Sequence, residues 1–160
     1  MRSRQITTPA VQPALDTETA TRLRAAIGRL SRRLRTTAAG RAAGLTPTGS
    51  SLLLNVDRNG PVRLSALAAS EGINPTMLSR VVAGLVEQRL LERSSDEGDR
   101  RAAWVKATRT GRLVAQRMRR ERTDAVNAAM DALGEREQRL IERALPALEA
   151  LAEELKERRP

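Results

Sequence analysis

Arginine is the residue type that most determines what chemistry this chain can perform, and two short segments present it beside small polar side chains. In the first segment Arg80 follows Thr76 and Ser79, and the second contains the pair Arg100 and Arg101. A guanidinium group can fork onto guanine O6 and N7 or onto phosphate oxygens, and a hydroxyl group can donate or accept a hydrogen bond. These residue types indicate an anionic, hydrogen-bonding partner. The alternative for Arg80 is an ordinary solvated charge.

The chain contains neither cysteine nor histidine. Their absence removes disulfides, thiol redox chemistry, most zinc sites and hydrolysis by a Ser-His-Asp triad. No Gly-rich phosphate loop is present, and the acidic residues are spaced as helical salt-bridge partners. We therefore expect no metal, no cofactor and no enzymatic activity.

The formal net charge of +10 comes almost entirely from arginine, since Lys106 and Lys156 are the only lysines. A basic excess of this size indicates nucleic acid as a partner. Trp104 is the only aromatic residue, and single-strand binders depend on aromatic stacking, so the composition favours duplex over single-stranded nucleic acid. The alternative is that the arginines reflect only the codon usage of a GC-rich genome.

Two short helices joined by a tight turn are predicted to position the first arginine segment. Ser65 is expected to cap the first helix, and Gly72 ends it. Asn74 as N-cap and Pro75 in the first turn start the second, which is apolar on one face. The pair forms a helix-turn-helix, whose second helix points its N-terminal residues at base edges in the major groove. The candidate residues for this contact are Asn74, Pro75, Thr76, Met77, Ser79 and Arg80.

A β-hairpin is predicted over residues 90–107, directly after the second helix, with Gly98 near its tip. Asp99 is expected to orient Arg100 or Arg101 through a bidentate ion pair. An arginine held in this way can enter the minor groove, where negative potential is concentrated. The alternative is a solvated, charged turn.

Further helices flank this region. The first apolar stripe, which includes Leu23 and Ile27, is expected to continue until Gly40 and Gly44 end the element, and the last helix should be kinked but not ended by Pro146. The long apolar stripe of the last helix is hard to cover in so small a domain, so we expect a partner chain to cover it, with packing inside the chain as the alternative. The predicted organisation is a flexible tail (1–16), a winged helix-turn-helix (46–108), and helical dimerisation regions (17–45 and 109–160).

The run from Leu64 to Gly111 resembles the MarR (multiple antibiotic resistance regulator) family. The matching segments are Leu64–Ala68, Asn74–Val82, Leu85–Glu87, Leu91–Arg93, Asp99–Ala102 and Thr108–Gly111. With the flanking helices the resemblance extends from about residue 18 to 158. One departure is Arg89, which stands where the family usually has glycine. A left-handed arginine is disfavoured by about 1 kcal/mol, so we expect this turn to differ slightly. Another is Ala107 in place of the usual leucine.

The resemblance implies a symmetric dimer formed mainly by the first, fifth and sixth helices of the family fold. It also implies a small anionic or phenolic effector bound between the dimer and DNA-binding regions. By position, the residues that would line that site are Arg29, Arg33, Leu52, Val56 and Leu113. The alternative for the two arginines is a solvated or phosphate-facing charge.

The expected fold is therefore mostly α with a small β-hairpin, namely a winged helix-turn-helix with N- and C-terminal dimerisation helices. The expected function is that of a homodimeric regulator of transcription that binds double-stranded DNA at a pseudo-palindromic operator. We expect it to act as a repressor, with an activator as the alternative, and to be released by a small-molecule effector. The alternatives are an architectural protein that coats DNA without sequence preference and a helical interaction module with no DNA role. No apolar run is long enough to cross a membrane, and we expect a cytoplasmic protein with no membrane partner.

Overall fold

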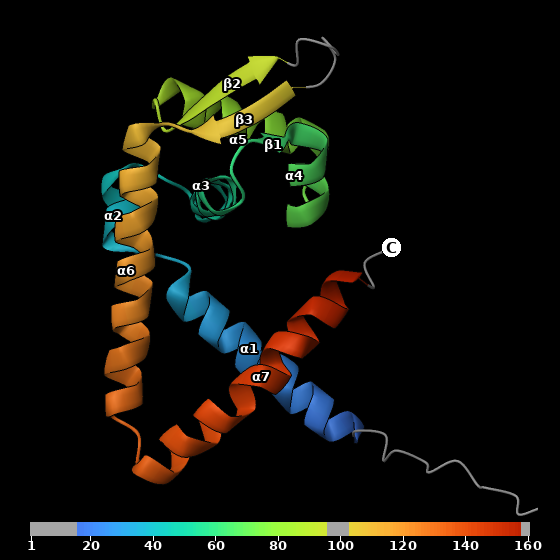
Figure 1. Ribbon diagram of the computed structural model, residues 1–160, viewed down its shortest axis with the longest axis vertical. Coiled ribbons are helices and arrows are strands. Elements are labelled where there is room, and N and C mark those ends of the chain that lie inside the picture. The colour runs from blue at the N-terminus through green and yellow to red at the C-terminus, as the bar shows by residue number, and fades with distance from the viewer. Residues whose placement is uncertain (1–15, 96–102, 158–160) are drawn as a thin grey trace, which may run out of the picture. The chain divides into compact units, whose positions relative to one another are not determined.

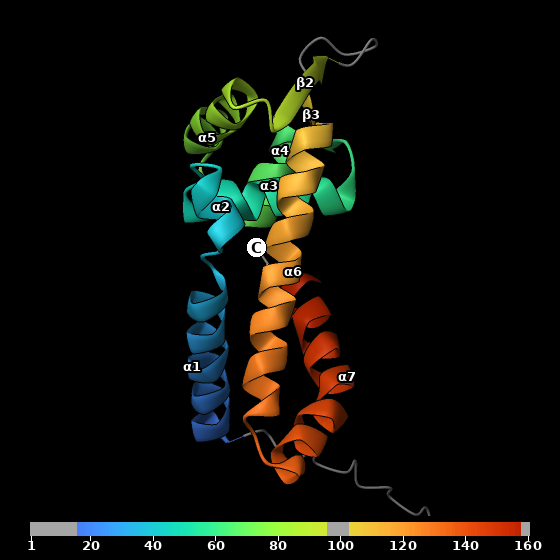
Figure 2. The same cartoon turned by 90° about the vertical axis from the view of Figure 1, so that its left-hand side faces the viewer.

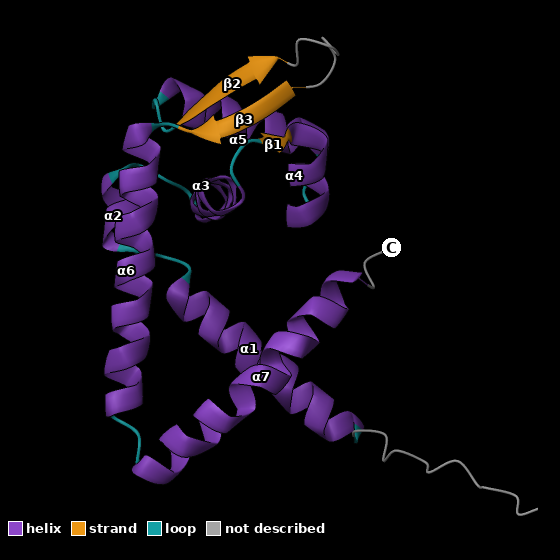
Figure 3. Cartoon of the chain, in the orientation of Figure 1, coloured by secondary structure: helices purple, strands orange, loops and turns teal. Residues whose placement is uncertain are grey.

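The computed structural model describes residues 16–95 and 103–157. The chain divides into two compact units, residues 1–35 and 36–160, and each is described by itself. The elements shown in Figure 1 are, in order, α1 (Thr17–Leu34), α2 (Ala38–Ala42), α3 (Pro47–Asn59), β1 (Val62–Arg63), α4 (Leu64–Glu71), α5 (Pro75–Glu87), β2 (Leu91–Ser95), β3 (Ala103–Ala107), α6 (Arg109–Asp131) and α7 (Glu135–Glu157). Helices and a small sheet account for nearly all of the described chain (Figure 3). The predicted fold class, a winged helix-turn-helix with flanking helices, is confirmed.

Helix α1 begins where the sequence predicts, but it ends earlier. The Asp16 side chain accepts a hydrogen bond from the Glu18 amide and caps the N-terminus. The helix stops at Leu34, and the separate helix α2 starts after Thr37, whose hydroxyl oxygen accepts a hydrogen bond from the Gly40 amide at 3.1 Å. The prediction of one continuous element up to Gly40 was therefore wrong. No residue of α1 is buried.

The short helix α2 is held by α6, which runs beside it (Figure 2). The Glu121 carboxylate on α6 accepts hydrogen bonds from the Ala38 and Ala39 amides at 2.6 and 3.0 Å. These two amides have no partner within their own helix, because the first turn of a helix leaves its N–H groups unpaired. A contact with a residue more than eighty positions away thus fixes where α2 begins.

The hydrophobic core lies where α3 contacts α5, α6 and β3. The amphipathic pattern of α3 turns Leu52, Leu53 and Val56 inward, and none of the three has any exposed surface. The other buried apolar residues of the core are Leu67, Ala68, Leu78, Val82, Leu85, Leu90, Leu91, Val105, Ala107, Ala115 and Met118. The core therefore joins both helices of the helix-turn-helix to the sheet and to the first half of α6.

The sheet has the order β1-β3-β2, with both pairs antiparallel. In its register Leu91 lies opposite Ala107, and Ser95 lies opposite Ala103. The short edge strand of the sheet is β1, where Val62 pairs with Val105. The predicted hairpin is confirmed as the paired strands β2 and β3.

Helix α4 starts two residues earlier than a cap at Ser65 would allow. It begins at Leu64 directly after β1, its N-cap position is Arg63, and no side chain caps it. The prediction for Ser65 was wrong because the strand leads straight into the helix. The predicted end is confirmed, since Gly72 has a φ of 64° in the left-handed region.

The long helices are α6 and α7. Thr108 caps α6, and its hydroxyl oxygen accepts a hydrogen bond from the Gly111 amide at 3.0 Å. Pro146 lies inside α7, which continues to Glu157. None of the helices in the described ranges combines the length and the apolar character required of a membrane span.

Candidate nucleic-acid interface

Helix α5 carries the predicted contact residues, and its local sequence fixes where it begins. The Asn74 Oδ1 atom accepts a hydrogen bond from the Thr76 amide at 2.8 Å, and Pro75 occupies the first helical turn. Proline is favoured there because its missing N–H would be unpaired in any case. The cap and Pro75 therefore fix where the helix starts, which sets the directions of the side chains that follow.

One face of α5 is buried and the opposite face is open. Leu78, Val82 and Leu85 pack into the core. All of the residues predicted to face DNA on this helix are exposed, namely Asn74, Pro75, Thr76, Met77, Ser79 and Arg80. Because these side chains surround the N-terminal end of α5, the structure brings the predicted set together on a single surface.

Arg93 on β2 is a further arginine beside this surface. Its Nη2 atom lies 3.5 Å from the Ser79 carbonyl oxygen, at the upper limit for a hydrogen bond. The sequence analysis did not single out Arg93 as a contact residue. The only signal in the sequence is position, because Arg93 belongs to the strand that follows α5 directly, but position alone does not show that the two residues meet.

The predicted wing residues Asp99, Arg100 and Arg101 lie outside the described residues. The described strands fix only where this segment joins the fold. Ser95 and Ala103, which flank it, lie opposite each other in the β2–β3 pair. The three residues therefore belong to the connection between the strands, and their predicted role stays a prediction.

A cation–π contact lies on the sheet next to the hairpin. The Arg63 guanidinium carbon is 5.1 Å from the centroid of the Trp104 ring, within the range of a favourable contact. The two residues are directly opposite each other in the β1–β3 pair. This contact joins the edge strand to the hairpin, and the sequence analysis did not anticipate it.

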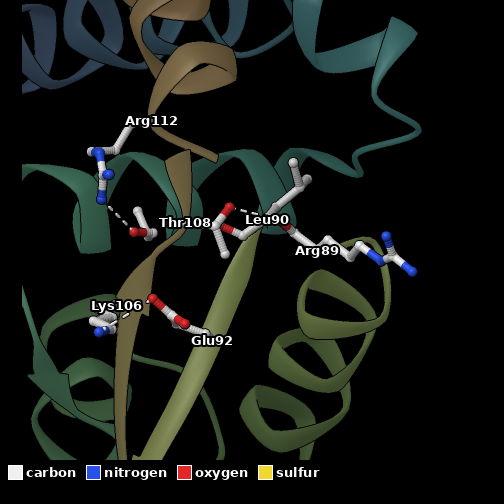
Figure 4. A network of polar contacts seen from close by, with 7 residues as sticks. Arg89, Leu90, Glu92, Lys106, Thr108 and Arg112 are labelled. Atoms are coloured by element: carbon white, nitrogen blue, oxygen red, sulfur yellow. Dashed lines mark hydrogen bonds and ion pairs between the residues drawn. The ribbon is translucent and has the colours of Figure 1, made fainter. Parts of the chain in front are cut away.

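The base of the hairpin is closed by Thr108, whose surroundings are drawn in Figure 4, and by Gly111, which ends the same Thr-x-x-Gly segment. The Thr108 hydroxyl group donates to the Arg89 carbonyl oxygen at 2.7 Å, and its amide donates to the Leu90 carbonyl oxygen at 3.1 Å. A Cβ atom on Gly111 would lie 2.0 Å from the same Leu90 oxygen. Only glycine allows this approach, so the motif connects the end of α5 to the start of α6.

Arg89 keeps the left-handed conformation that its position requires, with a φ of 57°. It is the only residue other than glycine with a positive φ in the described parts of the chain. The expectation that this turn differs because of the arginine was wrong. The Thr108 bond to its carbonyl group and the neighbouring backbone bonds hold the turn in the geometry that glycine would adopt freely.

Two of the residues predicted to line an effector site are fully buried. Leu52 and Val56 have no exposed surface, because the inward face of α3 forms the core. Leu113 is half-exposed on α6. Arg29 and Arg33 are exposed on α1, which belongs to the other unit. Leu52 and Val56 are core residues, so their assignment to an open site is corrected.

A different cavity, of about 430 Å³, opens between α3, the end of α4 and α6. Its lining consists of Ser51, Leu54, Asn55, Arg58, Asn59, Glu71, Arg119, Arg122 and Thr123. Three of these residues are arginines and only one is acidic. None of these lining residues was predicted from the sequence, because the predicted residues of α3, Leu52 and Val56, lie on its core-facing side, whereas Leu54 and Arg58 lie on the other.

The charges in this cavity are partly compensated. The Glu71 carboxylate accepts hydrogen bonds from the Ser51 hydroxyl at 2.7 Å and the Asn55 amide at 2.6 Å. Arg119 forms an ion pair at 2.5 Å with Asp57. Burial lowers the pKa of the Arg122 guanidinium from its ordinary value, because desolvation penalises the charged form. The cavity therefore has a positive and partly desolvated lining.

Comparisons with known proteins agree with this arrangement. The model of the MarR family matches residues 45–103. A protein of Pseudomonas aeruginosa PA01 assigned as a transcriptional regulator is 30% identical, with a TM-score of 0.69 over 85% of this chain and 95% of its own. Transcriptional regulator Tm0710 from Thermotoga maritima is 23% identical, with a TM-score of 0.70 over 90% and 100%. No curated protein sequence matches the chain.

One similar structure has been solved with nucleic acid. FabT from Streptococcus pneumoniae, in complex with DNA, shares the fold at 17% identity, with a TM-score of 0.66 over 85% of this chain and 99% of its own. The fold and the exposed start of α5 define a winged-helix, DNA-binding regulator of transcription. The chain belongs to the MarR family.

Proposed function

We propose that this protein is a homodimeric repressor that binds a pseudo-palindromic site in double-stranded DNA and is released by a small anionic or phenolic molecule. The observation that supports it best is the open N-terminal end of α5, where the predicted contact residues are all exposed while the opposite face is fixed in the core. A recognition helix has to present its first turns in this way to reach base edges.

An uncovered apolar stripe on α7 supports the dimer. The exposed large apolar residues of this helix are Leu140, Ile141, Leu145, Leu148 and Leu155. Ile141, Leu145 and Leu148 are spaced by four and three residues, and Leu155 follows seven residues later, so these four lie on one face. A stripe of this length on a protein in water favours a second copy of the chain as its cover. A twofold dimer presents two recognition helices one helical turn apart, and this geometry predicts the symmetric DNA site.

The cavity beside α3 supports the effector. An anionic ligand fits its lining because Arg58 and Arg122 contribute positive charge at its walls. In the similar fold of NadR, solved in complex with 4-hydroxyphenylacetate, a small phenolic acid is bound. We therefore propose the cavity as the region to test for effector binding. The predicted residues Leu113, Arg29 and Arg33 are not part of its lining, and their role stays a separate prediction.

The DNA proposal is tested by competition between the gene's own upstream region and random duplexes at stated salt. We expect the upstream DNA to bind at least about a thousandfold more tightly. Equal affinities would contradict the proposal and favour an architectural coat, and no salt-dependent affinity at all would favour a helical interaction module.

Replacing both Arg100 and Arg101 with alanine tests the wing. We expect much weaker binding in a gel-shift assay, because both guanidinium groups are predicted to reach the adjoining groove. The matched control replaces Arg136 and Arg143 of α7, which removes the same charge from exposed positions elsewhere. If both double variants lost the same amount of DNA affinity, the effect of Arg100 and Arg101 would be due to net charge alone and not to a contact made by the wing.

The effector proposal is tested by adding arylcarboxylates, including 4-hydroxyphenylacetate, to the protein–DNA complex. We expect release of the DNA by at least one of them, and loss of that response when Leu54 is replaced by tryptophan, which would fill the cavity. If the Leu54→Trp variant still released DNA in response to the same compound, this cavity would not be the effector site.

A further inference from the structure

Met77 is an unusual residue on the surface of α5. Its side chain is 53% exposed, while every other large apolar residue of this helix is buried or half-buried. Among the described residues of the winged helix-turn-helix, 46–95 and 103–108, it is the only large apolar side chain that is exposed. A flexible thioether left in water at this position suggests a contact outside the chain.

The position of Met77 on the helix shows where that contact lies. It is three residues after the N-cap Asn74 and three residues before Arg80, so it shares a row of the helix surface with the arginine. Side chains on a helix lean toward its N-terminus, which is the end that enters the groove. Its neighbours Thr76 and Ser79 are small, so they leave room for its approach.

The major groove offers one apolar group to such a side chain, the C5-methyl of thymine. The other groups at the base edges are hydrogen-bond donors and acceptors, which a thioether matches poorly. We propose that Met77 is a specificity-determining residue that selects thymine at one position of each half-site by burying its methyl group. This inference depends on the proposed sequence-specific binding of DNA.

The test removes that methyl group without changing any hydrogen bond, by replacing thymine with uracil. Binding sites are selected from random duplexes, and each thymine of a selected site is then replaced in turn. For the wild-type protein we expect one thymine in each half-site whose replacement weakens binding about fourfold, the effect of removing about one buried methyl-sized group. Replacement of the other thymines should have a smaller effect.

Two variants assign the effect to Met77. Met77→Ala should bind the thymine and uracil duplexes equally, while Met77→Leu, which keeps an apolar side chain of similar size, should retain the preference. Gln88→Ala, at the other end of the same helix, should keep the wild-type ratio. A wild-type protein insensitive to every methyl group, or a Met77→Ala variant that still prefers thymine at that position, would overturn the inference. Selection of no preferred site would instead overturn the proposed function and this inference with it.

Discussion

Arg89 shows how a single residue can be kept in a conformation that it does not favour. Its φ of 57° places it in the left-handed region, where an L-residue with a Cβ atom is strained. The hydrogen bonds at the base of the hairpin are formed by backbone groups and Thr108, so they do not depend on the Arg89 side chain. The fold therefore tolerates arginine at a cost in stability.

Replacing Arg89 with glycine should recover that cost. We expect the free energy of unfolding, measured by urea denaturation, to rise by about 1 kcal/mol, because glycine enters the left-handed region without steric strain. The control is Gln88→Gly, since Gln88 has a φ of −73° and its replacement should lower the free energy of unfolding. If both variants changed stability in the same direction, strain at Arg89 would not be the cause.

Gly111 and Gly84 make a second comparison between residues of the same type. A Cβ atom on Gly111 would be 2.0 Å from the Leu90 carbonyl oxygen, whereas one on Gly84 would have no neighbour within 4 Å. We expect Gly111→Ala to lower the free energy of unfolding by about 3 kcal/mol, because backbone has to move. Gly84→Ala should raise it by roughly 0.5–1 kcal/mol through helix propensity. Thermal or urea unfolding of the two variants measures both changes in the free energy of unfolding. A decrease well below about 3 kcal/mol for Gly111→Ala would contradict the close approach of Gly111 to the Leu90 carbonyl group.

At the scale of elements, the boundary between α1 and α2 is the clearest difference from the sequence prediction. The apolar spacing continues past Leu34, so periodicity alone predicts one helix. The structure starts a new helix at Ala38, where Thr37 provides one cap and Glu121 provides a second from α6. The spacing of α1 gave no sign of a partner so distant in the sequence.

Glu121 should therefore contribute to the stability of α2. Replacing it with alanine removes the acceptor of the Ala38 and Ala39 amides and should cost about 1–2 kcal/mol. Glu121→Gln keeps one acceptor oxygen and should lose less. Hydrogen exchange at these two amides provides the local readout, and unchanged protection in the alanine variant would show that α2 does not depend on this contact.

At the scale of the whole molecule, the proposed dimer connects the α7 stripe to DNA binding. Leu145→Asp places a charge in the middle of this exposed stripe and should convert the protein to a monomer in sedimentation experiments, because a buried unpaired carboxylate is costly. DNA binding should then weaken at least about a hundredfold, since the two half-sites are no longer bound together. Glu149→Ala, an exposed change on the same helix, should leave both properties as they are. A dimeric Leu145→Asp variant would place the interface elsewhere.

Local signals in the sequence were sufficient for most of the winged helix-turn-helix. Asn74-Pro75 fixed the start of the recognition helix, Gly72 fixed the end of the helix before it, and Thr108 fixed the start of α6. Each of these caps pairs a side chain or a backbone conformation with amides a few residues away, so the information is local. The exposed face of α5 could be predicted because the spacing of its apolar residues, which is also a local pattern, shows which face is buried.

The cavity beside α3 could not be predicted in this way. Its lining comes from three helices, and the choice between the two faces of α3 depends on which of them the core takes. The same limit applies to Arg63 over Trp104, which meet only because β1 and β3 pair in a particular register. Arg93 lies near Ser79 because β2 contacts α5.

The amino-acid sequence by itself determined the order of the elements, most of their ends and the side chains offered at the start of α5, because capping and periodicity act over a few residues. Only the tertiary structure decided that Leu52 and Val56 are core residues. It also decided that Glu121 of α6 caps the start of α2 and that Arg89 adopts a left-handed conformation. Those outcomes depend on contacts between distant segments, where packing and backbone hydrogen bonds outweigh the preference of any single residue.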